Sequence, residues 1–277
     1  MQTDSLQYRF SFALETLAQV PGEFVLPAGV GELQTGVFLP GDDADWLGRR
    51  RYLPHVLLLC GRELLMMPHP SSAEQPVRVP LDAIAQIEWG RILLTGWIVL
   101  KWDGGRLHLP YNTRSRAPVE RAVKAILECW LPAATAQRQS AACFGPPLDI
   151  KFTNALSAEL IAQEAIVAQL YQPADRSLRR RFWFQGGTTT AGDLLLLTSR
   201  RILWITERHK GKYGRYGAVS HTARLSSVAR CAIAGQSSDI EIQFSRGESW
   251  RIPLREAWGP AARDFVGQAI VGCGLPS

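Results

Sequence analysis

Residues 57–67 read LLLCGRELLMM, and residues 195–205 read LLLTSRRILWI, so the two stretches align without a gap. The offset between them is 138 residues, about half of the 277-residue chain. Self-similarity at a fixed spacing indicates a repeated structural unit. The pair therefore predicts two similar domains in tandem.

Five further pairs of segments resemble each other in the same order along the chain. They are 8–14 with 150–156, 49–52 with 179–182, 81–84 with 225–228, 107–110 with 250–253, and 118–123 with 260–265. Their offsets run from 130 to 144 residues, a drift that small loop insertions produce. We expect a duplication of the whole chain, with a first unit at residues 1–131 and a second at 148–277. Residues 132–147, rich in Ala, Gln, Ser, Gly and Pro, read as the linker.

Short runs that are apolar throughout or alternate with polar residues fill most of each half. Gly, Pro, Asp and Ser separate them, a pattern typical of antiparallel strands. The predicted strands are 32–39, 50–60, 63–67, 77–81, 84–89, 97–102 and 106–110 in the first half, and 180–185, 193–198, 202–206, 219–225, 228–232, 240–245 and 249–253 in the second.

Each predicted set of strands is followed by one amphipathic helix. The first begins near Ser115 and runs to Trp130, and the second begins near Pro260 and stops at Gly272. Short helices are also predicted ahead of the strands, at residues 13–20 and 156–171. The expected fold class is α+β, mainly β: each unit has about seven antiparallel strands in a bent sheet or partly open barrel, capped by its C-terminal helix.

The segment 193–205 has the form LLLT-x-x-R followed by apolar residues. It resembles the corresponding hairpin of bacterial pleckstrin-homology-like (PH-like) domains. The step at 224–228, the hairpin at 240–253 and the terminal helix follow in the order that this family has. The resemblance implies two tandem PH-like units, a fold that hosts many functions.

The resemblance covers residues 176–272 well and residues 46–131 more weakly. In the first half, Cys60-Gly61-Arg62-Glu63 replaces the Thr-x-x-Arg pattern. Pleckstrin domains proper carry a Trp within the last helix. Here Trp130 lies near the end of one predicted helix and Trp258 near the start of the other, so the resemblance is to the broader fold.

Composition indicates a protein with packed cores, because 46% of residues are hydrophobic and 20% are charged. No apolar run approaches about 18 residues, so no transmembrane segment is expected. The first residues lack the features of a signal peptide, and the cysteines form no C-x-x-C pair. We expect a cytoplasmic location, with peripheral membrane association left open, and buried thiols at the five cysteines, which are Cys60, Cys129, Cys143, Cys231 and Cys273.

Motifs of catalysis are absent from the sequence, which has no nucleophile elbow, Walker loop or zinc-protease signature. The acids Asp42, Asp43 and Asp45 lack the closing Glu of a calcium loop, and residues 186–192 lack the lysine of a phosphate loop. We therefore predict no enzyme activity, no catalytic residue, no metal and no cofactor.

The most distinctive polar segment, residues 208–217, lies between two predicted strands. Its lysines and arginines can neutralise phosphate, and its tyrosines can lie at a membrane interface or stack on a base. The corresponding loop of the first half, 68–76, has neither Lys nor Arg. The candidate ligand-binding residues are Arg208, Lys210, Lys212, Tyr213, Arg215 and Tyr216.

A simpler interpretation is also open, namely an exposed hairpin kept soluble by charge. The Arg triplets 49–51 and 179–181 read in the same two ways, as a charged rim or as a second phosphate-facing patch. The net charge of +6 and the pI near 9.3 fit an anionic partner as well as ordinary surface composition.

Two functions from different classes follow. The first is a non-catalytic binding or scaffolding protein that offers sheet edges and helix faces to a protein partner or to copies of itself. The second is a peripheral binder of anionic lipid headgroups or other phosphate-bearing ligands through residues 208–217. Nucleic acid comes third as a partner, and we do not expect it.

Overall fold

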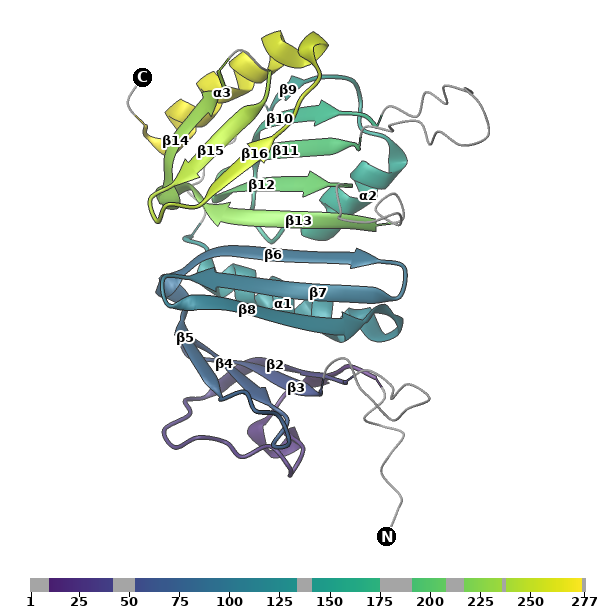
Figure 1. Cartoon of the computed structure of the whole chain (residues 1–277), viewed down its shortest axis with the longest axis vertical. Coiled ribbons are helices and arrows are strands. Elements are labelled where there is room, and N and C mark those ends of the chain that lie inside the picture. Colours follow the sequence, from purple (N-terminus) through teal and green to yellow (C-terminus); the bar gives the residue numbers. More distant parts are fainter. Residues whose placement is uncertain are drawn as a thin grey trace. The chain divides into compact units, whose positions relative to one another are not determined.

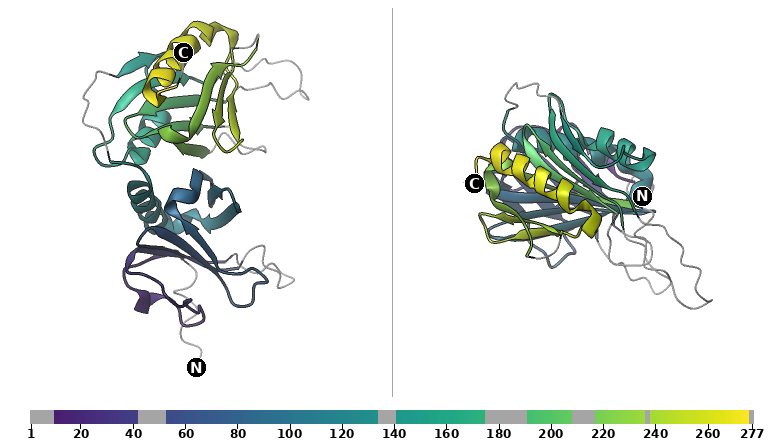
Figure 2. Two further views of the ribbon diagram at one scale, coloured as in Figure 1. Left: turned by 90° about the vertical axis from the view of Figure 1, so that its left-hand side faces the viewer. Right: turned by 90° about the horizontal axis from the view of Figure 1, so that it is seen from above.

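The computed structural model describes residues 10–41, 53–133, 141–174, 191–207, 217–235 and 238–275. The chain divides into unit 1, Met1–Pro132, and unit 2, Ala133–Ser277 (Figures 1 and 2). Both units are mainly β and end in a helix. Among the described residues, none of the sheets closes into a barrel.

Unit 1 begins with a five-stranded antiparallel sheet in which each strand pairs with its neighbour along the chain. Its strands are β1 (Phe12–Leu14), β2 (Leu33–Leu39), β3 (His55–Cys60), β4 (Glu63–Pro68) and β5 (Val77–Pro80). The β3–β4 hairpin is the first copy of the repeated stretch. It turns at Gly61, whose φ of +57° suits a residue without a Cβ.

Three longer antiparallel strands and a helix complete unit 1: β6 (Ile84–Ile92), β7 (Thr95–Trp102), β8 (Gly105–Asn112) and α1 (Arg116–Trp130). The predicted apolar face of α1 is buried, including Val119, Val123 and Ile126. Trp130 is also buried, and its Nε1 donates a hydrogen bond to the carbonyl of Ile84 at 3.1 Å. The C-terminal helix is therefore fixed to the start of β6.

Unit 2 also consists of antiparallel strands followed by a C-terminal helix, with one strand and one helix ahead of them. Its elements are β9 (Ala142–Phe144), α2 (Ile150–Glu159), β10 (Ile166–Gln172), β11 (Asp193–Thr198), β12 (Arg201–Thr206), β13 (Gly217–Arg224), β14 (Val228–Ile233), β15 (Ile240–Phe244), β16 (Ser249–Ile252) and α3 (Gly259–Cys273). Strands β10 to β13 pair antiparallel in sequence order, and β9 pairs parallel with β10. Strands β14 to β16 form a second antiparallel sheet.

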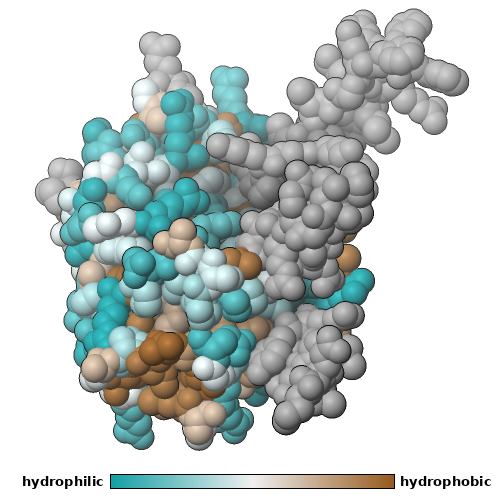
Figure 3. All heavy atoms as spheres, turned by 60° about the horizontal axis from the view of Figure 1, so that its bottom comes forward, coloured by the Kyte–Doolittle hydropathy of each residue, from teal (hydrophilic) through white to brown (hydrophobic). Residues whose placement is uncertain are grey.

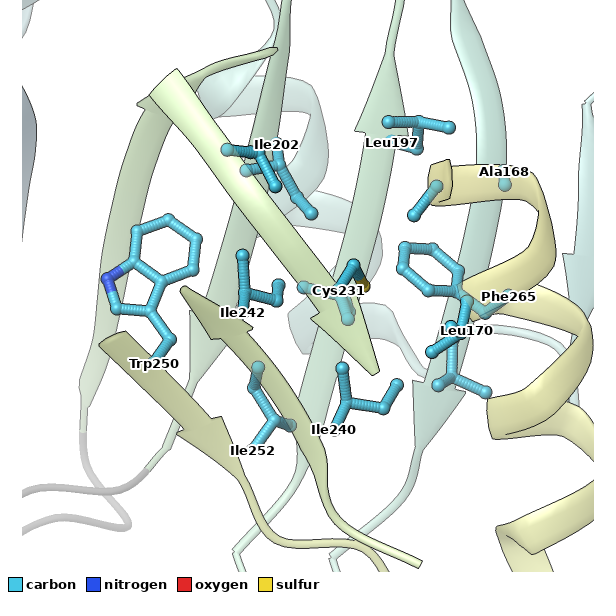
Figure 4. Close-up of a cluster of buried hydrophobic side chains, with 14 of the residues drawn as sticks. Ala168, Leu170, Leu197, Ile202, Cys231, Ile240, Ile242, Trp250, Ile252 and Phe265 are labelled. Atoms are coloured by element: carbon cyan, nitrogen blue, oxygen red, sulfur yellow. The ribbon is translucent and has the colours of Figure 1, made fainter. Parts of the chain in front are cut away.

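Successive side chains of a strand point to opposite faces, so the β10–β13 sheet has two apolar faces to cover. One face packs on β14–β16 and α3 (Figure 4), and its core includes Leu197, Ile202, Ile242 and Phe265. The other face packs on α2, where Phe152 lies against a cluster formed by Tyr171, Leu194, Leu196, Leu203 and Ile205.

Unit 1 covers the equivalent face of its first sheet without an α-helix. Phe24, Leu17 and Val20 from the N-terminal segment pack against Phe38 and its neighbours on β3 and β4. Figure 3 turns the side of unit 1 that lies lowest in Figure 1 toward the viewer and shows apolar side chains gathered at the surface. Among the described residues of unit 1, the exposed large hydrophobic side chains are Phe10, Val25, Leu93 and Leu94.

From β2 in unit 1 and from β10 in unit 2, the order of strands and the C-terminal helix is the same. Strands β2 to β8 and β10 to β16 are each seven antiparallel strands, followed by a 15-residue helix. The sequence predicts one bent sheet of about seven strands in each unit. In the structure, the seven strands of each unit do not form one continuous sheet. A 3-10 turn after β5 (Leu81–Ala83) and another after β13 (Leu225–Ser227) separate the first strands of each unit from the last three.

The predicted N-terminal helix at residues 13–20 is wrong. This stretch contains β1 and a single 3-10 turn, Leu17–Gln19. Pairing explains the difference, because Phe12 lies opposite Phe38 and the two rings stack with centroids 4.9 Å apart. A helix of eight residues forms too few hydrogen bonds to compete with that pairing.

The helix predicted over 156–171 is also wrong in most of its length. The helix α2 lies earlier, and Ile166–Gln172 is strand β10. The chain breaks between them at Gln163, which has a φ of +61°. Leu170 and Tyr171 pack into the cores on opposite faces of the sheet. A strand that is apolar on both faces has apolar residues at spacings that also fit a helix, which explains the wrong prediction.

Part of the predicted linker belongs to unit 2. Residues 142–144 form β9, whose Ala142, Cys143 and Phe144 pair with Ala168, Gln169 and Leu170 of β10. Residues 50–52 and 180–185 of two predicted strands lie outside the described residues.

Replacing Gly96 with alanine is expected to destabilise the protein by about 1–3 kcal/mol, the usual cost of overpacking. Three ring atoms of the buried Tyr111 lie within 2.7 Å of the position that the new Cβ would take. Urea unfolding measures the loss. The control is Gly267→Ala, which meets no atom within 4 Å in the helix α3 and should stabilise by about 0.5–1 kcal/mol. An equal response to the two changes would contradict the packing around Tyr111.

Candidate functional site

The six candidate residues of the basic segment lie outside the described residues, as do the Arg triplets 49–51 and 179–181. These six are Arg208, Lys210, Lys212, Tyr213, Arg215 and Tyr216. The structure does describe the residues that bracket the segment, Glu207 and Gly217, and the strands that lead to them. The candidate site is therefore described through Glu207, Gly217 and the strands that hold them, which we call its frame.

Four residues pair in a row across the β10–β13 sheet: Gln172 with Asp193, Asp193 with Thr206, and Thr206 with Val219. They mark the end of β10, the start of β11, the end of β12 and the start of β13. The connections 173–192 and 207–216 thus begin and end where these strands end, on one side of the same sheet. We call this row of strand ends, with Glu207 and Gly217, the polar end of unit 2.

One lysine ties the two ends of the basic segment together. Lys151, in the first turn of α2, donates from Nζ to Oε1 of Glu207 at 2.6 Å and to the carbonyl of Gly217 at 2.9 Å. The other carboxylate oxygen of Glu207 accepts from the amide of Gly192 at 3.0 Å. The Glu207 side chain is only 6% exposed, so its charge is held by these short, charge-assisted contacts.

The start of α2 is fixed at the same polar end. Asp149 accepts from the amide of Phe152 at 2.9 Å, an N-cap, and from the hydroxyl of Tyr171 at 2.8 Å. Burial, followed by the nearby Asp149 carboxylate, raises the pKa of Tyr171 well above its ordinary value. Tyr171 therefore stays a neutral donor, and the cap places Lys151 beside Glu207.

The inner face of the polar end carries aromatic side chains and one buried acid. Asp193 accepts from Nε1 of Trp204 at 3.1 Å and from the hydroxyl of Thr206 at 2.7 Å. The Trp204 ring stacks on His221 with centroids 4.7 Å apart, and both rings approach Trp250. These contacts lie on the side of the sheet that faces β14–β16.

The opposite end of the same strands holds a buried ion pair, which accounts for the Thr-x-x-Arg motif. Arg201 donates to both carboxylate oxygens of Glu164, at 2.7 and 2.9 Å, and to the carbonyl of Glu159 at 2.6 Å. Thr198 donates to Glu164 at 2.7 Å. The Arg201 and Glu164 side chains are both fully buried.

Burial alone would raise the pKa of Glu164, but the hydrogen bond and charge of Arg201 outweigh it and hold the pKa below its ordinary value. Glu159 accepts from the hydroxyl of Ser220, so β13 joins the network. In unit 1 the corresponding positions of the repeat are Cys60 and Glu63. The motif is therefore a structural device that fixes the loop after α2 to the β11–β12 hairpin.

Both buried acids of the polar end are already engaged by neighbouring side chains. Glu207 is engaged by Lys151, and Asp193 by Trp204 and Thr206. Within the described ranges, no three His, Cys, Asp or Glu side chains are grouped so that they could hold a metal ion. The acids Asp42, Asp43 and Asp45 lie outside those ranges.

All five cysteines are free thiols, but the expectation of buried thiols is only partly right. Cys60 and Cys231 are buried, whereas Cys143 is exposed on the edge strand β9. Burial raises the pKa of Cys231 to about 12 and that of Cys273 to about 11. The thiolate is the reactive form, so these two should be inert at neutral pH.

We expect Ellman's reagent at pH 8 to modify Cys143 first in the native protein. Cys60, Cys231 and Cys273 should react only after unfolding in urea, because burial raises the pKa of each of these thiols. The Cys143→Ser variant removes the fast phase. A fast phase that survives in this variant and maps to Cys231 would contradict the packing of β14 on α3.

In the part of the chain that the structure describes, no helix is long and apolar enough to cross a membrane. The sequence matches no model of a known protein family, and it resembles no curated protein closely enough to count as a relative. A function for this chain therefore rests on the chemistry of its own residues.

Proposed function

We propose that this protein is a non-catalytic binding or scaffolding protein built from two tandem PH-like units. The observation that supports this proposal is the repeated order of seven antiparallel strands and a 15-residue helix. The hairpins β3–β4 and β11–β12 stand 138 residues apart within that order, as in the sequence repeat. Two copies of one unit provide two separate surfaces for a protein partner or for a second copy of the chain.

Size-exclusion chromatography with light scattering, over a range of concentrations, tests the version that rests on self-association. The expected result is a mass that rises above the 30.7 kDa of one chain as the concentration increases. A mass of one chain at every concentration would remove self-association from the proposal and leave a different protein as the partner.

A second candidate function is favoured by the polar end of unit 2. This function is the binding of anionic lipid headgroups, or of other phosphate-bearing ligands, through the basic segment 208–217. Glu207, the acid at the base of the segment, is already paired with Lys151 at 2.6 Å. The cations of the segment are therefore not required to neutralise Glu207, which favours an external anion as their partner.

Vesicle flotation tests this function in the full-length protein. We expect binding to vesicles that contain phosphatidylserine and little binding to neutral phosphatidylcholine vesicles. The Lys210→Ala/Lys212→Ala/Arg215→Ala variant should bind about a hundredfold more weakly, since each cation near an anionic surface contributes about 1 kcal/mol. Competition with inorganic pyrophosphate distinguishes a phosphate-selective site from general attraction to the surface.

The matched control removes the same charge from exposed positions of unit 2, namely Arg230, Arg246 and Arg263. The β15–β16 turn, which carries Arg246, lies beside Ser227 and so at the end of β13 opposite to Gly217. The Arg230→Ala/Arg246→Ala/Arg263→Ala variant should keep most of its affinity. Equal loss in the two triple variants would show that only the net charge matters and would rule out the basic segment as a site.

A further inference from the structure

The tip of the β6–β7 hairpin in unit 1 presents two leucines to solvent. Ile92 pairs with Thr95, so Leu93 and Leu94 alone form the turn (Figure 1). Each is 56% exposed, among the most exposed large hydrophobic side chains of the described residues. Neither leucine contributes to a core.

The backbone of this turn is unfavourable for the residue that occupies it. Leu93 has a φ of +52°, and it is one of only two described residues other than glycine with a positive φ. Two-residue hairpin turns favour glycine or asparagine at such a position. Neither stability nor solubility accounts for leucine here, and strained residues of this kind concentrate at functional sites.

The tip is held in place rather than left loose. The Thr113 hydroxyl donates to the carbonyl of Leu93 at 2.7 Å, and the Thr113 amide donates to the carbonyl of Leu94 at 3.0 Å. Thr113 opens the 3-10 turn that leads from β8 into α1. The two leucines are therefore presented in a fixed arrangement, which lowers the entropic cost of inserting them into a partner.

Positive charge accompanies the tip. Arg91 precedes it by two residues, and Arg114 and Arg116 follow the residue that anchors it. Glu120 is the carboxylate among them, and it lies 3.0 Å from Arg91 and 3.8 Å from Arg116. Three guanidinium groups against one carboxylate leave this end of the hairpin with an excess of positive charge.

We propose that the Leu93–Leu94 tip is a membrane contact that inserts into the surface of an anionic bilayer. The leucines enter the boundary between headgroups and acyl chains, while Arg91, Arg114 and Arg116 stay among the anionic headgroups. A convex tip of two residues is too small for the roughly 800 Å² per partner that a stable protein interface buries. This contact lies in unit 1 and uses none of the residues 208–217, so it goes beyond the function proposed for unit 2.

The test is flotation of the full-length protein with vesicles of phosphatidylserine and phosphatidylcholine. The Leu93→Gly/Leu94→Asn variant places glycine at the position of positive φ, so it should fold and should unfold at a higher urea concentration than the wild type. Its affinity for the vesicles should fall at least about tenfold, because two apolar side chains no longer leave water. An unchanged affinity in this variant would overturn the proposal.

The matched control is Ile150→Ser/Val271→Ser, which removes two other exposed apolar side chains, both of unit 2. It should bind like the wild type, and an equal loss in this variant would overturn the proposal in favour of general surface hydrophobicity. The triple variant of segment 208–217 separates the two proposals. If the triple variant loses vesicle affinity and the tip variant does not, the membrane tip alone is rejected. If the tip variant loses affinity and the triple variant does not, the basic segment alone is rejected.

Discussion

Replacing Arg201 with methionine is expected to lower the free energy of unfolding by about 3–5 kcal/mol. The change leaves the carboxylate of Glu164 fully buried without its cation. It also removes the donor to the carbonyl of Glu159, so the loop after α2 loses its attachment to β12. Urea unfolding followed by tryptophan fluorescence measures the difference.

The double variant Arg201→Met/Glu164→Met separates the ion pair from the packing around it. Buried ion pairs replaced by apolar residues of similar volume often cost little, so the double variant should recover most of the loss. Losses that simply add would mean that Arg201 and Glu164 do not act as a pair. The equivalent unit 1 residue offers a control: Glu63 is exposed, and Glu63→Gln should change stability by less than about 0.5 kcal/mol.

The contribution of this ion pair also depends on pH. The pKa of Glu164 in the folded protein lies below its ordinary value of 4.5, so the unfolded state binds a proton more readily. The stability from the pair is therefore fully present above pH 4.5 and is lost as the pH falls through the lowered value. We expect the difference between the wild type and Arg201→Met to shrink at acidic pH. A difference that grows on acidification would contradict the pairing.

Replacing Phe265 with alanine is expected to cost about 3–5 kcal/mol. Phe265 is fully buried where α3 packs on both sheets of unit 2, next to Leu170 and Cys231 (Figure 4). The cavity that remains cannot collapse easily between rigid strands. Urea unfolding measures the loss, with Gly267→Ala on the exposed side of the same helix as the control. A loss below about 1 kcal/mol would show that α3 does not close the core of unit 2.

The sequence predicts the hairpins well because their signals are local. The alternating residues 240–244 and the two gap-free copies around Cys60 and Thr198 all lie in the predicted strands. The local pattern does not predict the N-terminal segments correctly, because pairing with distant strands overrides it. Phe12 pairs with Phe38 in a strand, and β10 is apolar on both faces.

The frame of the candidate site could be predicted only in part. The sequence identifies the basic segment, which no described residue tests, but it gives no sign of the lysine that holds its ends. Lys151 meets Glu207 across 56 residues and Gly217 across 66, contacts that depend on where α2 lies over the sheet. The Thr198 and Arg201 motif was visible, whereas its partner Glu164 is set by the loop after α2.

Both lipid proposals, for the segment 208–217 and for the Leu93–Leu94 tip, claim that this chain binds anionic surfaces. Vesicle affinity as a function of salt tests that claim most directly. The wild type should bind phosphatidylserine vesicles at low ionic strength, bind neutral vesicles little, and lose affinity as sodium chloride rises from 0.05 to about 0.5 M, where screening shortens the reach of its cations. Equal binding to neutral vesicles, or no binding to anionic vesicles at low salt, would contradict the claim.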